Sequence, residues 1–185
     1  MAGLVLRAWA GVTAAAPWPR AEALTTPRLV LEPLRPEHAR ELAPILADPA
    51  LHAFTGGEPA GESDLRARFT RQAAGHSPDR AQGWLNWVAR DRATQAPVGT
   101  VQATISDDDG VRTAALAWVV ATSRQGEGLA TEAARAARDW LRGREVTRFV
   151  AHIHPDHGPS AVVARHLGLA ATGERRDGEV RWVGS

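Results

Sequence analysis

The chain has 185 residues, with 22 arginines against 21 acidic residues, and it contains no lysine, cysteine or tyrosine. The missing residue types exclude a lysine Schiff base, a lysine-dependent phosphate loop, a thiolate nucleophile and a zinc site built on sulfur. The formal net charge of +1 gives no basic excess, so we do not expect a nucleic-acid partner. No apolar run reaches the ~20 residues that span a bilayer. We therefore expect a cytoplasmic protein that has no membrane partner.

The first part of the chain divides into a tail and the start of a domain. Residues 1–23 are rich in Ala, Pro and Gly without a sustained hydrophobic period, so we expect a tail or extra strand before a domain at 24–185. No basic cluster precedes their apolar part, which argues against an export signal. Alternation over 28–34 predicts a half-buried strand, and the helix after Pro36 should stop at Asp48-Pro49. A loop over 54–61, a helix over 62–74 and a loop over 75–80 follow.

The middle of the chain is typical of an antiparallel meander that leads into a strand–helix alternation. Strands are predicted at 84–90, 98–105 and 112–120, with turns at 91–97 and 107–110. A glycine loop then precedes a helix over 129–142 that ends at Gly143, and a strand covers 148–154. A short helix over 160–167 and strands at 170–174 and 179–183 complete the chain. This order predicts one α+β domain with a mixed sheet.

The most informative segment runs from Gln125 to Ala133, between a predicted strand and a predicted helix. Gly126 and Gly128 permit backbone conformations that side chains forbid and let a ligand approach the main chain. The N–H groups that open a helix attract anions, so a phosphate site can be built here without lysine. Thr131 stands where a dinucleotide fingerprint would have its third glycine, which argues against that motif. A purely structural turn remains an alternative.

Two separated motifs resemble one known family. Gln125, Gly128 and Ala130 fit the Q/RxxGxG/A pyrophosphate loop of the GNAT superfamily of acetyl-CoA-dependent N-acetyltransferases. The block from Pro155 to Leu169 is similar to the PxNxxSxxVxxxLGF segment of the branch that contains the ribosomal-protein alanine N-acetyltransferases, and residues 24–31 resemble its opening strand. The resemblance implies a GNAT fold, with a mixed, mostly antiparallel sheet between helices. In that fold the strand at 112–120 bulges and splays from the strand at 148–154.

The resemblance also implies acetyl-CoA as cosubstrate, with its pantetheine arm in the gap between those two strands. Main chain at Trp118 and Val120 would pair with the arm, and His157 and Ser160 would also contact the cosubstrate. The pyrophosphate would be held by a loop comprising Gln125, Gly126, Glu127, Gly128, Leu129, Ala130 and Thr131. We expect the side chain of Glu127 to point to solvent.

The family's usual catalytic groups are partly missing. Ala164 occupies the place of a tyrosine that protonates the leaving thiolate in many members, and a serine suggested for this role in the resembled branch is matched by Ser160. Its alternative role is that of a helix N-cap. A coenzyme A thiol with a pKa of about 8.5 needs only modest help near neutral pH.

The general base is less well defined, because Ala115 replaces a glutamate often found in that branch. His154, at the expected strand end, is the preferred candidate. Glu179, Glu32 and a water chain are alternatives. The histidines near His154 suit a metal by ligand type, but we expect a hydrogen-bonded cluster and no metal. Arg135 could lie beside the 3′-phosphate, although the arginines of its helix favour a solvated face.

These features predict an acetyltransferase. It would move the acetyl group directly to a primary amine of a small molecule or peptide, such as a protein N-terminus, and would be a monomer or homodimer. The alternative is a non-catalytic acyl-CoA-binding module that keeps the cleft without the chemistry.

Overall fold

The computed structural model describes residues 18–52, 59–108 and 110–185. Its strands are β1 (Leu24–Thr25), β2 (Leu29–Pro33), β3 (Gly83–Asp91), β4 (Pro97–Asp108), β5 (Val111–Val120), β6 (Arg148–Ile153), β7 (Ala170–Arg176) and β8 (Glu179–Gly184). They form one sheet in the order β1-β2-β3-β4-β5-β6-β8-β7. Neighbouring strands are antiparallel except β5 and β6, which are parallel. The predicted mixed, mostly antiparallel sheet is confirmed.

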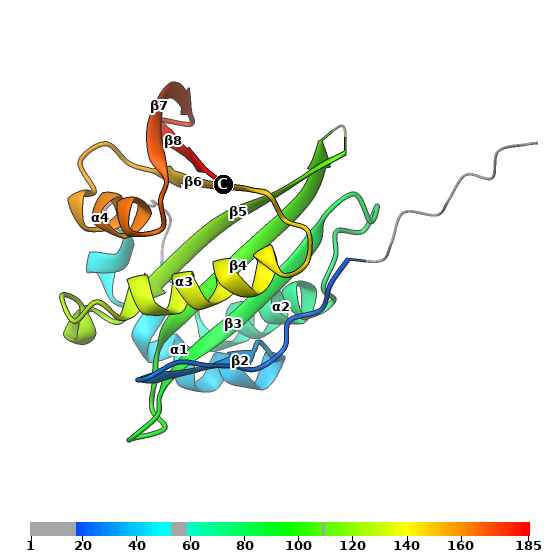
Figure 1. The fold of residues 1–185 in the computed structure, drawn as a ribbon. Coiled ribbons are helices and arrows are strands. Elements are labelled where there is room, and N and C mark those ends of the chain that lie inside the picture. Colours follow the sequence, from blue (N-terminus) through cyan, green and yellow to red (C-terminus); the bar gives the residue numbers. More distant parts are fainter. Residues whose placement is uncertain (1–17, 53–58, 109) are drawn as a thin grey trace, which may run out of the picture.

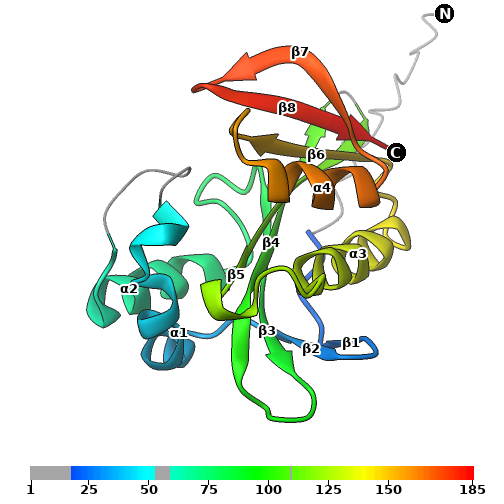
Figure 2. The ribbon, with the colours of Figure 1, turned by 90° about the vertical axis from the view of Figure 1, so that its left-hand side faces the viewer.

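Helices pack on both faces of this sheet. They are α1 (Ala39–Leu46), α2 (Glu62–Ala73), α3 (Leu129–Arg142) and α4 (Gly158–His166), with 3₁₀ turns η1 (Pro36–His38), η2 (Pro49–His52) and η3 (Thr122–Arg124). α3 and α4 cover one face, and α1 and α2 cover the other (Figures 1 and 2). The α+β class and the placement of helices on both faces are therefore confirmed. No helix in the described ranges is long and apolar enough to cross a membrane.

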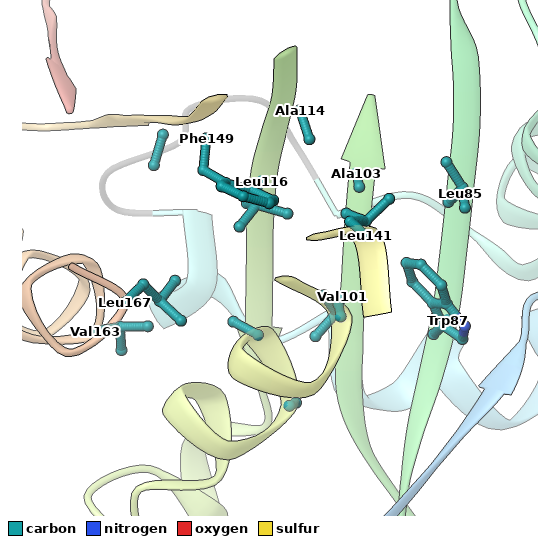
Figure 3. Packing of buried hydrophobic residues seen from close by; sticks show 14 of the residues in the cluster. Leu85, Trp87, Val101, Ala103, Ala114, Leu116, Leu141, Phe149, Val163 and Leu167 are labelled. Carbon is teal, nitrogen blue, oxygen red and sulfur yellow. The ribbon is translucent and has the colours of Figure 1, made fainter. Parts of the chain in front are cut away.

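Two hydrophobic clusters hold the layers together. The larger lies between the sheet and α3 and α4, where Trp87, Leu141 and Phe149 are fully buried (Figure 3). Ala114 and Leu116 of β5 both reach it because alternate strand residues face the same side. The smaller cluster packs α1 and α2 against the reverse face. Burying one large apolar side chain contributes about 1.5–3 kcal/mol, so these clusters fix the position of the helices on the sheet.

Most predicted element boundaries lie within two residues of the observed ones, although β4 continues to Asp108. The strand predicted over 28–34 is confirmed as β2, and a short strand, β1, precedes it. β1 and β2 form an antiparallel pair there, with Leu24 opposite Leu31. The chain reverses between them because the Thr26 N–H donates to the Leu29 carbonyl and the Leu29 N–H donates to Thr26 Oγ1, both at 2.9 Å. Residues 54–58 of the predicted loop lie outside the described residues.

The parallel pair β5–β6 is short, and the two strands then part. Only Thr113, Ala114 and Ala115 of β5 pair with β6, although β5 continues to Val120. The last part of β6 pairs with β8 alone. The predicted splay is confirmed. The predicted bulge of β5 is wrong, since its register with β4 runs without a shift from Gly99–Val120 to Asp108–Val111.

The described residues before β1 form no helix or strand, but they contact the domain. Trp18 packs against the larger cluster and its indole N–H donates to the carbonyl of Arg80 at 2.8 Å. The carbonyl of Glu22 accepts from the indole of Trp87 at 2.8 Å. Residues 1–17 lie outside the described residues, so the tail or extra strand at 1–23 stays a prediction.

Candidate functional site

The glycine loop lies where β5 ends and α3 begins. After η3, Gly126 and Gly128 adopt left-handed conformations with φ of +80° and +78°. A Cβ atom added at Gly126 would have no neighbour within 4 Å, so this side of the loop is open. Glycine is favoured at both positions because other residues pay a backbone penalty in this region. The two glycines therefore keep the main chain accessible immediately before the helix.

The loop presents a row of free main-chain donors. Within the described residues, the N–H groups of residues 126–131 have no hydrogen-bond acceptor. The next N–H group, that of Glu132, donates to the carbonyl of Gly128 at 3.1 Å. The start of a helix also carries a partial positive charge. Six adjacent donors at a helix start form a cradle for an anion such as a diphosphate. The residues present therefore fit the phosphate groups of coenzyme A without a lysine.

The side chain of Glu127 is exposed, as predicted, and it is also held by a neighbouring arginine. Its carboxylate forms two hydrogen bonds with the Arg124 guanidinium, at 2.8 and 3.0 Å, while 42% of the side chain stays exposed. Arg124 also pairs with Asp91 at 3.0 Å. Hydrogen bonding from Arg124 lowers the pKa of Glu127 below its ordinary value. Arg124 thus offsets the negative charge that Glu127 would otherwise bring to the loop.

The loop is tied to the end of β5. The amide Nε2 of Gln125 donates to the carbonyl of Val120 at 3.2 Å. The carbonyl of Val120 is therefore already hydrogen-bonded within the protein. Trp118 is half-buried and lies in the part of β5 that does not pair with β6. The edge of β5 over residues 116–120 is open on the β6 side. Its main-chain groups can pair with amides of an extended ligand in the way that a strand adds to a sheet.

The start of α4 lies at the same end of the molecule as the glycine loop (Figures 1 and 2). His157 is the N-cap of α4, since its Nδ1 accepts from the N–H of Ser160 at 3.2 Å. The alternative role of Ser160 as N-cap is therefore wrong, because the cap position falls three residues earlier. With Nδ1 accepting, a neutral His157 carries its proton on Nε2 and can donate from there. The Ser160 hydroxyl stands in the first turn of α4.

The candidate bases lie near the end of β6. Ile153 is opposite Val180, and His154 and Glu179 are the next residues on each chain, so both belong to one end of the sheet. The Nδ1 of His154 accepts from the N–H of Asp156 at 3.2 Å. A neutral His154 then carries its proton on Nε2, and it must release the Asp156 N–H before Nδ1 can take a proton.

Glu32 is committed elsewhere. It accepts from Arg90 at 2.7 Å and from Arg35 at 2.5 Å, and it lies 3.4 Å from His38. Burial raises the pKa of Glu32, but the hydrogen bond from Arg90 and the nearby cations outweigh it, so the pKa lies below its ordinary value. A carboxylate held this way is a weak base. Of the two alternative carboxylates, Glu179 is therefore the better candidate.

Two arginines of α3 are anchors between helices. The predicted solvated face is wrong for Arg138, whereas Arg135 is exposed as predicted. Arg138 is only 12% exposed and donates to the carbonyl of Leu167 at 2.7 Å. Arg135 donates to the carbonyl of His166 at 3.3 Å. Both cap the C-terminal carbonyls of α4 and so hold α4 against α3.

The sequence reasoning missed the contacts between the β1–β2 turn and the loop. Arg28 pairs with Glu132 at 2.7 Å and donates to the carbonyl of Glu127 at 2.8 Å. These residues are about a hundred positions apart, and only the helix-start position of the acidic Glu132 could have drawn attention to it.

Comparisons with known proteins agree with this geometry. A family model described as "Acetyltransferase (GNAT) domain" matches residues 28–170, which is more than half of the chain. A search of curated protein sequences finds no match.

Several solved structures share the fold. An acetyltransferase from Agrobacterium tumefaciens is 24% identical, with 89% of this chain and 95% of that chain covered and a TM-score of 0.67. The RimL ribosomal L7/L12 alpha-N-protein acetyltransferase in complex with coenzyme A is 17% identical, with 88% and 97% covered and a TM-score of 0.73. A ribosomal-protein-S5-alanine acetyltransferase from Vibrio fischeri is 14% identical, with 89% and 96% covered and a TM-score of 0.73.

Proposed function

The chain belongs to the GNAT family of acetyltransferases, and on that premise we propose that it transfers an acetyl group from acetyl-CoA directly to a primary amine, on a peptide N-terminus or a small molecule. The observation that carries the proposal is the row of main-chain donors at residues 126–131, next to the gap between β5 and β6. Every helix start leaves its first N–H groups without acceptors, and here the loop adds those of Gly126 and Glu127 to them, which makes the row longer than a helix start alone provides. The solved relatives that act on ribosomal-protein amines support a peptide acceptor.

Two parts of the protein bind and orient the cosubstrate. The N–H groups of the loop from Gln125 to Thr131 hold the diphosphate. The open edge of β5 near Trp118 and Val120 pairs with the amides of the pantetheine arm, and His157 donates a hydrogen bond from Nε2. Acetyl-CoA supplies the acetyl group as a thioester. Fixing both ends of the long arm directs that thioester into the gap between the strands, which lowers the entropic cost of the reaction.

The transfer needs one proton acceptor and one proton donor. The amine nitrogen forms a bond to the acetyl carbon, the bond from carbon to sulfur breaks, and the proton lost by nitrogen balances the one gained by sulfur. Ser160 donates toward the sulfur from the first turn of α4. His154 or Glu179 receives the amine proton at the end of β6 and β8, and the main-chain N–H near Val120 stabilises the oxyanion.

A thiol-release assay tests the proposal. The protein is incubated with acetyl-CoA and a panel of amines that includes peptides with free N-termini, and free coenzyme A is measured. We expect amine-dependent release, with kcat reduced about 10- to 100-fold in Ser160→Ala and coenzyme A affinity little changed. Tight coenzyme A binding without release for any amine would favour the non-catalytic module, a reading supported by Ala115 and Ala164. Absence of coenzyme A binding would refute both.

A further inference from the structure

A compact set of contacts joins the β1–β2 turn to the glycine loop. The carboxylate of Glu132, in the first turn of α3, accepts three hydrogen bonds. Its Oε1 accepts from Thr26 Oγ1 at 2.6 Å and from the Arg28 N–H at 2.8 Å, and its Oε2 accepts from Arg28 Nε at 2.7 Å. Only 16% of the Glu132 side chain is exposed. Both carboxylate oxygens are therefore used, and they fix the guanidinium of Arg28 in one orientation.

Arg28 uses the rest of its guanidinium to grip the loop itself. Its Nη1 donates to the carbonyl of Glu127 at 2.8 Å. No cis peptide bond is found among the described residues. In a trans peptide the carbonyl of one residue and the N–H of the next point in opposite directions. Holding the Glu127 carbonyl on the side of the β1–β2 turn therefore directs the Gly128 N–H away from that turn.

The contacts of Arg28 with Glu132 and with the Glu127 carbonyl, here called the clamp, place a carboxylate close to the anion site. A carboxylate in the first helical turn stabilises the helix, but it also repels an anion bound at that helix start. Hydrogen bonds and the Arg28 charge keep Glu132 ionised, and its pKa lies below the ordinary value although burial acts to raise it. The electrostatic cost of an acidic residue beside a diphosphate site is offset if that residue also positions the loop.

We infer that Arg28 and Glu132 are positioning residues for the phosphate-binding loop: Glu132 orients the Arg28 guanidinium, and Arg28 holds the Glu127 carbonyl so that the Gly128 N–H faces the diphosphate. This inference rests on the proposed function. It assigns to the β1–β2 turn, about a hundred residues away in sequence, a part in cosubstrate binding. Neither residue needs to touch the ligand.

The matched control is Arg92. Its Nη1 donates to the carbonyls of Thr26 and Pro27 at 3.0 and 3.1 Å, so it stabilises the same turn without reaching the glycine loop. Arg28→Lys and Arg92→Lys both keep the charge and lose the fixed fork of the guanidinium. A lysine at 28 cannot bond Glu132 and the Glu127 carbonyl in the same geometry. The two substitutions therefore separate loss of the clamp from loss of turn stability.

The experiment measures coenzyme A affinity by calorimetry and the melting temperature of each variant. We expect Arg28→Lys to raise the Kd for coenzyme A about tenfold, the equivalent of one lost charge-assisted hydrogen bond. The Kd of Arg92→Lys for coenzyme A should stay within about twofold of the wild-type value. Its melting temperature should fall by about as much as that of Arg28→Lys.

Glu132→Gln tests the clamp from its other side, so the inference can still be tested if an arginine variant fails to fold. Removal of a negative charge near the site strengthens anion binding on electrostatic grounds alone, whereas loss of the clamp weakens it. We expect the Kd to rise about fivefold. Unchanged or tighter binding in Glu132→Gln, or equal affinities in the two arginine variants, would overturn the inference and leave the proposed function intact. A wild type that does not bind coenzyme A would overturn both.

Discussion

Replacing Gly126 with alanine should leave the protein folded and weaken its binding of coenzyme A. Gly126 has a φ of +80°, where a residue with a Cβ pays about 1–2 kcal/mol. No atom lies within 4 Å of the added Cβ, so steric overlap adds nothing to this cost. Proteins are typically stable by about 5–15 kcal/mol, so the variant should fold. We expect its melting temperature to fall by about 2–4 °C for each kcal/mol lost.

The effect on binding should be larger than the effect on folding. The new methyl group would occupy the open side of the loop and push a diphosphate away from the nearest N–H group. Loss of one hydrogen bond to a charged group costs about 1.5–3 kcal/mol, which corresponds to a Kd raised roughly 10- to 100-fold. Isothermal titration calorimetry with coenzyme A measures this change directly.

Gly110 provides the matched control for this substitution. Its φ is +81° and a Cβ there also has no neighbour within 4 Å, but it lies at the opposite end of β5 from the loop. Gly110→Ala should therefore lose the same stability and keep the wild-type affinity for coenzyme A. Equal affinities in Gly126→Ala and Gly110→Ala would refute the assignment of the loop to phosphate binding.

Three further predictions concern stability. Gly99→Ala should lower the free energy of unfolding by about 1–3 kcal/mol or more in a denaturant titration, because its Cβ would lie 2.0 Å from the carbonyl oxygen of Val119 on β5; unchanged stability would contradict the close approach of β4 and β5. Burial lowers the pKa of His38 below its ordinary 6.5, so the unfolded chain binds more protons and stability should fall as the pH drops below about 6.5. Melting temperatures measured across that range should show a smaller loss in His38→Gln, and identical profiles would argue against this contribution. Trp18→Ala should lower the melting temperature by several degrees in a thermal scan through lost packing against Gly83, and the same melting temperature as the wild type would show that this contact is unimportant.

The sequence predicted those features that local patterns encode. The bounds of α3 follow from the glycines on either side of it, Gly128 and Gly143, and they agree with the structure. The start of α4 was placed at Ser160, two residues late, because a histidine cap at His157 is less common than a serine cap. The fold class followed from the order of strands and helices and from the family motifs. Local spacing therefore identified most of the elements and the phosphate loop.

The rest depends on contacts between distant parts of the chain, which no local pattern contains. The pairing of Arg28 with Glu132 spans 104 positions. The burial of Arg138 depends on where the end of α4 falls, and the pairing of Glu127 depends on Arg124 being held by the β3–β4 turn through Asp91. For the chemistry, Ser160 and His154 stay predictions, since geometry alone does not identify a proton donor or acceptor.

The position of β8 has a consequence for the way this protein opens. β8 follows β7 in sequence but lies between β6 and β7, so β7 is joined to the sheet only through β8. Detachment of β8 from β6 must therefore release β7 at the same time. Because an isolated two-stranded hairpin is at best marginally stable in water, the backbone amides of β7 should exchange at least as fast as those through which β8 is bonded to β6. The edge hairpin then forms one cooperative unit, and its opening would uncover β6 and the His154 end of the sheet.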